Sequence, residues 1–216
     1  MKLIILFLLI DVLIIGCNPR SDKKQTKIFL KEQTMTNTNL DTIVLGGGCF
    51  WCVEAIYDRV KGVEKVISGY TGGDVENPTY NQVCSGNTGH AEVCQIIYDS
   101  SIVSVDELLK IFFSIHDPTT LNRQGADEGT QYRSVIFYLN ESQKEKAEFY
   151  KHKLDNAGIY SSKIVTEISK FGKFYSAEEY HQDYYENNSN QGYCKFVIQP
   201  KVEKFEKIFA EQIKSK

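Results

Sequence analysis

Short apolar runs and helically spaced apolar positions divide residues 41–98 into three strands and one helix. The runs Asp41–Leu45, Val63–Tyr70 and Glu92–Tyr98 are typical of strands. Between the first two runs, apolar residues recur at helical spacing at Phe50, Val53, Ile56, Tyr57 and Val60. Gly62 is expected to end that helix. The Gly-, Asn- and Thr-rich stretch Thr71–Gly89 predicts a long loop.

A second helix and a fourth strand complete the pattern. Ser104 and Glu107 have the spacing of a capping box, which predicts a helix that runs to about Ile115. A polar loop over His116–Gln131 leads into a strand over Tyr132–Leu139. The order strand, helix, strand, strand, helix, strand is that of a split βαβ, or ferredoxin-like, unit. The sequence therefore predicts an α+β fold, a two-layer sandwich with a mixed sheet.

C-terminal extensions follow this core. We expect a helix over about Glu141–Asn156 and a strand near Ile164–Ile168. Ser176 with Glu179 predicts another capped helix, and apolar spacing predicts a terminal helix from Val202 to about Ile213.

The first residues have the pattern of an export signal. Met1-Lys2 precedes an apolar run over Leu3–Gly16, which is broken by Asp11 and is too short to span a bilayer comfortably. Its end, Ile14-Ile15-Gly16-Cys17, resembles the lipobox of bacterial lipoproteins. This resemblance implies a signal peptide over residues 1–17 and lipidation of Cys17. Asp11 departs from the pattern, so a plain N-terminal anchor or a mis-assigned start are alternatives.

The remaining chain divides into a tether and one domain. Residues 18–40 are rich in Lys, Asn, Thr, Gln and Ser without periodicity, which predicts a flexible tether. Residues 41–216 form the predicted domain, and the 42% hydrophobic content of the 216-residue chain is enough for a core. We expect an exported, membrane-anchored protein that faces the periplasm or the cell exterior; the alternative is a cytoplasmic one. The formal charge of -3 gives no sign of the basic face that nucleic-acid binding would need. We also expect a monomer.

One stretch carries the candidate chemistry. Residues 46–54 read Gly-Gly-Gly-Cys-Phe-Trp-Cys-Val-Glu and join the first strand to the first helix. Cys49 is therefore expected at a helix N-terminus, where the helix dipole and unpaired N–H groups favour a thiolate. A thiolate is the reactive form of cysteine, so Cys49 is a candidate nucleophile. Phe50 and Trp51 can form an apolar wall beside it.

The other cysteines leave several interpretations open. Cys49 and Cys52 form a C-x-x-C pair, as in thioredoxin-like redox helices or half of a zinc site. Zinc would need a second close pair, and Cys84 and Cys94 are too far apart in the chain, so we expect no metal. Cys94 lies in a strand pattern and is expected to be a buried apolar residue.

Several motifs in order resemble the A-type peptide methionine sulfoxide reductases. They are Gly48-Cys49-Phe50-Trp51 with Glu54; Gly69-Tyr70-Thr71-Gly72-Gly73; Asn77-Pro78-Thr79-Tyr80; Val83-Cys84-Ser85-Gly86; Thr88-Gly89-His90-Ala91-Glu92; His116-Asp117-Pro118; and Gly129-Thr130-Gln131-Tyr132-Arg133-Ser134. The resemblance runs from about residue 42 to about residue 200. It implies repair of oxidised methionine in proteins, with selection of the S epimer and without a metal or organic cofactor.

The resemblance also implies roles for single residues. Cys49 would attack the sulfoxide sulfur and become a sulfenic acid as methionine leaves. Glu92, with a raised pKa, would act as the acid, and the hydroxyls of Tyr80 and Tyr132 would bind the sulfoxide oxygen. The remaining implied roles belong to Phe50 and Trp51, which would receive the S-methyl group, and to Asp127 and His181, which would organise the site.

A further cysteine is needed to reduce the sulfenic acid. The resemblance implies that Cys194, in Gly192-Tyr193-Cys194, resolves it to a disulfide that thioredoxin or a similar dithiol reduces. The polar residues Asn187–Gln191 predict a mobile segment that brings Cys194 close. Cys52, one turn along the same helix as Cys49, is the alternative resolver.

Two rival functions remain. A thiol–disulfide oxidoreductase would pair Cys49 with Cys52 and would not need Glu92. A non-catalytic surface lipoprotein would use the same fold for binding and would turn over no sulfoxide.

Overall fold

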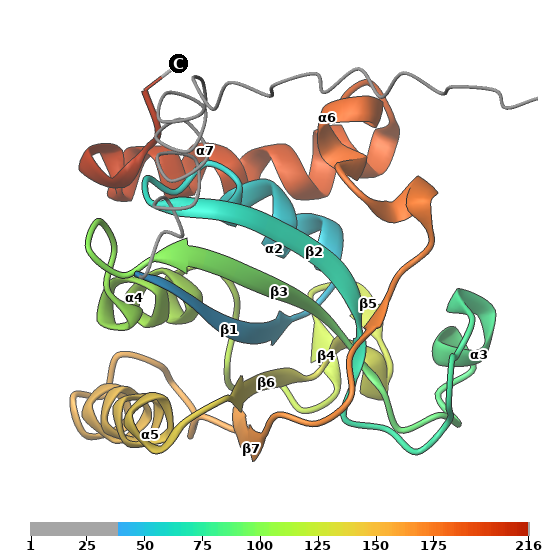
Figure 1. The fold of residues 1–216 in the computed structure, drawn as a ribbon, viewed down its shortest axis with the longest axis horizontal. Helices are drawn as coiled ribbons and strands as arrows, with labels where there is room; N and C mark the ends of the chain where they lie inside the picture. The colour runs from blue at the N-terminus through green and yellow to red at the C-terminus, as the bar shows by residue number, and fades with distance from the viewer. Residues whose placement is uncertain (1–38, 216) are drawn as a thin grey trace, which may run out of the picture. The chain divides into compact units, whose positions relative to one another are not determined.

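The computed structural model describes residues 39–215, which are built around one six-stranded sheet (Figure 1). The strand order is β7-β6-β1-β3-β2-β8. The core elements, in chain order, are β1 (Leu40–Gly47), α2 (Phe50–Tyr57), β2 (Val63–Thr71), β3 (Ala91–Asp99), α4 (Val105–Ile115) and β6 (Ser134–Tyr138). The four central strands, β6-β1-β3-β2, are antiparallel and have the order of a split βαβ unit. The predicted α+β fold with a ferredoxin-like core is confirmed.

The C-terminal part of the chain widens the sheet at both edges. α5 (Glu141–Asn156), at the predicted bounds, leads to β7 (Glu167–Lys170), which pairs with β6 in parallel. β8 (Tyr175–Ser176) pairs with β2 in antiparallel orientation at the other edge. The sheet is therefore mixed, as predicted.

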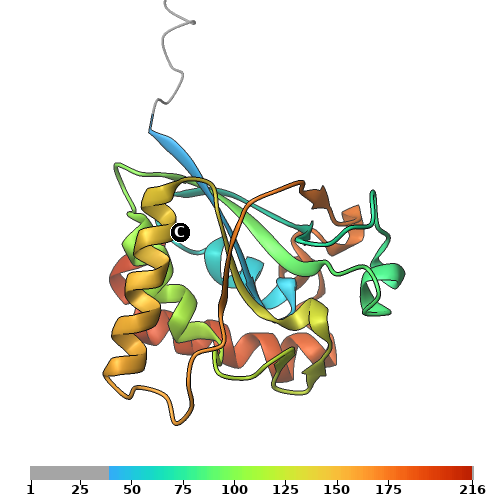
Figure 2. The same cartoon turned by 90° about the horizontal axis from the view of Figure 1, so that it is seen from below.

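The two faces of the sheet carry separate apolar clusters. The larger cluster includes residues of α2, α4 and α7 (Gln199–Ile208), and the Tyr57 hydroxyl donates to the Leu108 carbonyl at 2.8 Å to join α2 to α4. On the opposite face, Phe171 and Phe174 pack against a small cluster that includes Val44 and Phe137. Those two phenylalanines belong to the segment between β7 and β8, which crosses this face of the sheet (Figure 2). The helices thus form one layer and the sheet the other.

Capping boxes begin two of the helices. The Ser104 hydroxyl accepts the Glu107 N–H at 3.2 Å, and the Glu107 carboxylate accepts the Ser104 N–H at 2.9 Å, so the predicted start of α4 is confirmed. The predicted loop over Thr71–Gly89 contains the short helix α3 (Tyr80–Cys84), which Thr79 and Gln82 cap in the same way. The T-x-x-Q spacing is a sequence signal for that helix.

Two predicted elements differ from the structure. Tyr132 does not lie in a strand; it ends a 3₁₀ helix, Thr130–Tyr132, which follows the hairpin of β4 (Arg123–Gln124) and β5 (Asp127–Glu128). The capped helix predicted from Ser176 and Glu179 is wrong, because Ser176 pairs with Gly69 in the sheet. Sheet pairing has overridden the local capping preference there.

The rest of the C-terminal chain is helical but irregular. It comprises the 3₁₀ helix Glu179–His181, α6 (Tyr184–Asn188), the π-helical turn Cys194–Ile198, α7, and the 3₁₀ helix Ala210–Gln212. The predicted terminal helix, Val202 to about Ile213, thus begins earlier and ends in a 3₁₀ turn.

The N-terminal predictions fall almost entirely on residues that the structure does not describe. The predicted signal peptide over 1–17, with Cys17, lies outside the described residues. The predicted tether over 18–40 does too, except for Asn39 and Leu40, the second of which begins β1. Within residues 39–215, no helix is long and apolar enough to cross a membrane.

Candidate active site

The candidate nucleophile lies where β1 turns into α2. Cys49 is the N-cap residue of α2, and its carbonyl oxygen accepts the Cys52 N–H at 3.0 Å. Gly48 precedes it with φ +96°, and a Cβ there would lie 2.7 Å from the side chain of Gln124, so this turn requires glycine. Cys49 is only 6% exposed. The turn therefore buries the thiol at the predicted helix start.

Glu92 on β3 faces the same helix start. Its Oε2 accepts the Phe50 N–H at 3.1 Å, and the residue is 1% exposed. Burial raises the pKa of Glu92 to about 8, although the hydrogen bond from Phe50 favours the charged form and offsets part of the shift. Glu92 is therefore mostly protonated at neutral pH and can donate a proton.

The surroundings of the Cys49 and Cys52 pair favour the thiol form of Cys49 and the thiolate form of Cys52. Burial raises the pKa of Cys49 well above its ordinary value, and the hydrogen bond with Cys52 and the charge of Glu92 raise it further. The pKa of Cys52 is lowered by the hydrogen bond with Cys49 and, against the effect of burial, by Lys201, whose Nζ donates to the Cys52 Sγ at 3.5 Å. Desolvation thus opposes the thiolate that the helix N-terminus was predicted to favour at Cys49.

Two tyrosines lie close enough to the buried carboxyl for its charge to act on their hydroxyls. Tyr80 begins α3, Tyr132 ends the 3₁₀ helix before β6, and both pack against the core cluster that contains Cys49. Burial is the main cause that raises the pKa of both tyrosines, and the charge of Glu92 contributes to each shift. Both hydroxyls therefore stay protonated at neutral pH and can donate hydrogen bonds.

Five rings form an aromatic cluster beside the nucleophile: Phe50, Trp51, Tyr80, His181 and Tyr184. The His181 ring centre lies 5.1 Å from that of Phe50, 5.5 Å from that of Trp51 and 4.4 Å from that of Tyr80. Tyr184 stacks on Trp51 at 3.6 Å with an interplanar angle of 6°. The cluster gives the site an apolar wall that can receive a methyl group.

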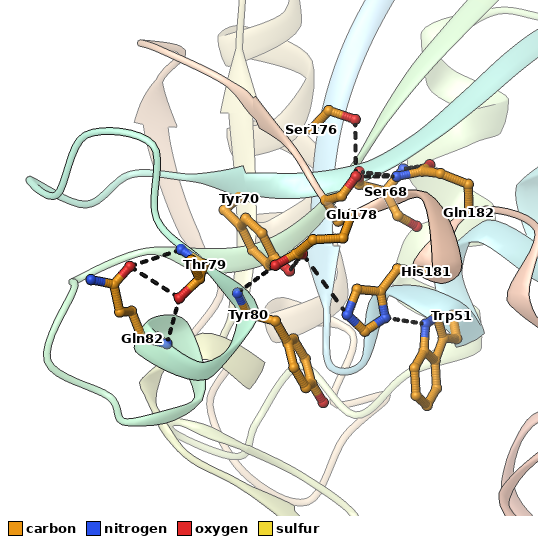
Figure 3. A network of polar contacts seen from close by, with 11 residues as sticks. Trp51, Ser68, Tyr70, Thr79, Tyr80, Gln82, Ser176, Glu178, His181 and Gln182 are labelled. Carbon is orange, nitrogen blue, oxygen red and sulfur yellow. Dashed lines mark hydrogen bonds and ion pairs between the residues drawn. The ribbon is translucent and has the colours of Figure 1, made fainter.

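The two predicted organising residues each act on Trp51. The Trp51 Nε1–H donates to His181 Nδ1 at 3.2 Å (Figure 3). The Tyr193 hydroxyl donates to Asp127 Oδ2 at 2.7 Å, and the Tyr193 ring meets the Trp51 ring edge-on at 5.8 Å between centres. Asp127 therefore reaches the cluster through Tyr193, and His181 reaches it directly.

Cys194 is not on an exposed segment. It begins the π-helical turn before α7, is fully buried, and belongs to the same apolar cluster as Cys49 and Cys52. The charge of Cys52 contributes to the raised pKa of Cys194, after burial. All five cysteines of the described residues are free thiols. Of the residues in 39–215, no group of three or more His, Cys, Asp or Glu is placed to hold a metal ion.

Sequence reasoning missed several residues of the site. Tyr184 stacks on Trp51, Tyr193 links Asp127 to it, and Lys201 contacts Cys52. Tyr193 had a local signal, since it directly precedes Cys194. Lys201 had none, because it lies 149 positions from Cys52.

This site defines a class of enzyme. A cysteine with a second sulfur in contact can change its oxidation state by two electrons, and the neighbouring protonated carboxyl can give a proton to a substrate oxygen atom as the bond to that oxygen breaks. The fold and the site thus describe a cysteine-dependent oxidoreductase that acts on an oxygen-bearing group.

Comparison with known proteins narrows the class. The family model of peptide methionine sulfoxide reductase matches residues 41–213. The peptide methionine sulfoxide reductase MsrA of Natronomonas pharaonis is 54% identical over 175 residues, or 81% of this chain and 98% of that protein. Its namesake from Saccharolobus solfataricus is 55% identical over 175 residues, with the same coverage. The chain belongs to the peptide methionine sulfoxide reductase family, of the A type.

Solved structures agree with the fold. Mxr1 of Saccharomyces cerevisiae in reduced form superposes with a TM-score of 0.66 at 36% identity, over 72% of this chain and 90% of that one. Methionine sulfoxide reductase A of Corynebacterium diphtheriae superposes with a TM-score of 0.65 at 37% identity, over 74% and 79% of the two chains.

The raised pKa of Glu92 predicts a pH dependence. If the protonated carboxyl is the acid, its contribution is complete well below pH 8 and is lost as pH rises through about 8. We expect the single-turnover rate of the pre-reduced enzyme, measured without added thiol, to show an alkaline limb, that is, to fall as pH rises through about 8. Glu92→Gln, whose amide does not titrate, should be slower but should lack the limb. An identical alkaline limb in this variant would assign the titration to another group.

Proposed function

We propose that the protein reduces methionine-S-sulfoxide in oxidised proteins and peptides, and also the free amino acid, to methionine. The observation that carries this proposal is the buried Cys49 thiol beside the protonated Glu92, against the wall of Phe50 and Trp51. The protein would thus repair oxidative damage with electrons from cysteine, without a metal or organic cofactor.

The first step is oxygen transfer. The Cys49 proton passes to Cys52, its hydrogen-bond partner, and Cys49 Sγ attacks the sulfoxide sulfur. Glu92 gives its proton to the sulfoxide oxygen, while the hydroxyls of Tyr80 and Tyr132 stabilise the charge that develops there. Methionine leaves and Cys49 becomes a sulfenic acid, so the cysteine is oxidised by two electrons as the sulfoxide is reduced by two. The substrate methyl group lies against Phe50 and Trp51.

The sulfenic acid is resolved by a relay of the two remaining sulfurs. Cys52 attacks Cys49 Sγ, which forms the Cys49–Cys52 disulfide and releases water; the contact with Lys201 supports Cys52 as the nucleophile. Cys194 then attacks Cys52, which restores the Cys49 thiol and leaves a Cys52–Cys194 disulfide. Cys194 is thus the final resolver, and thioredoxin or a similar dithiol reduces it by exchange.

The protein would work outside the cytoplasm as a monomer. The lipobox-like end at Cys17 supports a lipid anchor, and the polar residues 18–40 support a tether between the anchor and the domain. The described chain supplies every side chain of the site, which supports the monomer; light scattering on the purified protein would test that state.

The catalytic roles predict the effects of single substitutions. Cys49→Ser should abolish turnover of the S epimer of a methionine sulfoxide peptide with a dithiol reductant. Glu92→Gln should lower kcat by about 100-fold or more, since it removes a general acid. Glu145→Gln, on the exposed face of α5, is the matched control and should be unchanged. Turnover of the R epimer, or full activity of Cys49→Ser, would contradict the proposal.

The relay predicts which disulfides can be trapped. After one equivalent of substrate without reductant, peptide mapping of the wild type should find Cys52 joined to Cys194. Cys194→Ser should stop at Cys49–Cys52, and Cys52→Ser should leave a sulfenic acid on Cys49 that dimedone labels. A Cys49–Cys194 disulfide in Cys52→Ser would show that Cys194 resolves directly.

The anchor predicts covalent lipid on one residue. In a bacterial host fed a labelled fatty acid, the full chain should be labelled and recovered with membranes, and Cys17→Ser should be unlabelled. Cys84→Ser, which alters an exposed cysteine of the described domain, should keep the label. Recovery of the unlabelled wild type in the cytosol would favour the cytoplasmic alternative.

A further inference from the structure

The Glu178 carboxylate lies against three elements of the site: β2, α3 and the 3₁₀ helix Glu179–His181 (Figure 3). Its Oε1 accepts the Tyr80 N–H at 2.9 Å, at the first residue of α3, and its Oε2 accepts the Tyr70 hydroxyl at 2.9 Å, from β2. Partial burial raises the pKa of Glu178, but the hydrogen bonds from the Tyr80 N–H, its own N–H and the Tyr70 hydroxyl lower it on balance. The carboxylate is therefore charged at neutral pH.

His181 carries the effect of this charge to Trp51. Its Nδ1 accepts the Trp51 Nε1–H at 3.2 Å, so Nδ1 bears no proton. Burial lowers the pKa of His181, and the neutral ring must therefore hold its single proton on Nε2. His181 is 1% exposed, and its Nε2 has no hydrogen-bond partner but lies 4.0 Å from Glu178 Oε2. A carboxylate at that distance attracts the Nε2 proton and so favours this tautomer.

We infer that Glu178 is a positioning residue of the reductase site, which anchors the backbone of Tyr80 and holds His181 in the tautomer that accepts the Trp51 hydrogen bond. The indole of Trp51 is then fixed at its N–H edge by His181 and on its face by Tyr184. Glu178 thus sets both the wall for the substrate methyl group and the start of the helix that carries the Tyr80 hydroxyl. The inference rests on the proposed function, which assigns these roles to Trp51 and Tyr80.

Two substitutions of Glu178 separate these contacts. In Glu178→Gln the amide oxygen can still accept the Tyr80 N–H, but an NH₂ group replaces the acceptor that faces His181 Nε2. We expect KM for a methionine-S-sulfoxide peptide to rise about tenfold with kcat within about twofold of wild type, because substrate binding is weakened more than the chemical step. Glu178→Ala removes the acceptors of the Tyr80 N–H and the Tyr70 hydroxyl as well as the charge that faces His181, and it should lower kcat too. Glu179→Gln alters the exposed neighbour and should match the wild type.

Spectroscopy tests the same inference without turnover. Long-range ¹H–¹⁵N spectra should place the His181 proton on Nε2 in the wild type and move it toward Nδ1 in Glu178→Gln, with His181→Gln used to assign the signals. Trp51 is the single tryptophan, so its emission should shift in Glu178→Gln and not in Glu179→Gln. A wild-type proton on Nδ1, or a Glu178→Gln protein with unchanged KM and emission, would overturn the inference. Absence of wild-type turnover would instead contradict the proposed function and would leave the tautomer result valid.

Discussion

The hydrogen bond from the Phe50 N–H to the Glu92 carboxyl is the contact on which the site depends. It joins the first turn of α2 to β3, and it satisfies a backbone donor that no helical carbonyl can reach. The register of the sheet makes it possible, because Leu45 pairs with Cys94 and so places Glu92 beside the turn that holds Cys49. The carboxyl is thereby fixed next to the nucleophile without an exposed acidic side chain. A slip of one residue in this register would turn Glu92 to the other face of the sheet.

Burial acts on the site in two opposing ways. It keeps Glu92 protonated and the tyrosine hydroxyls neutral, which suits groups that must give a proton or a hydrogen bond to oxygen. The same burial disfavours a thiolate on Cys49, which suits a nucleophile poorly. The contact between Cys52 and Lys201 offers an answer within the fold, since it places a cation beside the second sulfur of the pair. The site can therefore store negative charge next to Cys49 while the acid nearby remains protonated.

The parts of the structure that were predictable are those with local causes. Apolar periodicity and the Ser104 capping box predicted the core order and α4, and the Gly-Cys-Phe-Trp motif located Cys49 at a helix start. Failures arose where distant contacts decide. Ser176 has a capping pattern but pairs in the sheet, and the charge state of Cys49 depends on burial that no sequence window reveals. Motif resemblance located Asp127 near the site, but not the route through Tyr193 by which it acts.

Residues 177–194, the least regular part of the described chain, complete the site. Side-chain hydrogen bonds explain how a segment with so little regular structure can hold site residues in place. Residues 177–194 add the histidine, tyrosines and last cysteine of the site, with little regular structure. Two side chains fix this segment to the core: the buried Glu54 accepts the Tyr184 N–H at 3.2 Å, and the half-buried Gln182 amide exchanges hydrogen bonds with the backbone of Ser68 at 3.0 Å each. These contacts hold the segment, and with it the aromatic cluster, against the core. They are few, however, so the segment can open locally at a lower free energy than the sheet can. A buried Cys194 must approach another sulfur to about 2 Å to form a disulfide, so it needs such an opening. Side-chain anchoring thus reconciles a fixed substrate wall with a cysteine that has to move.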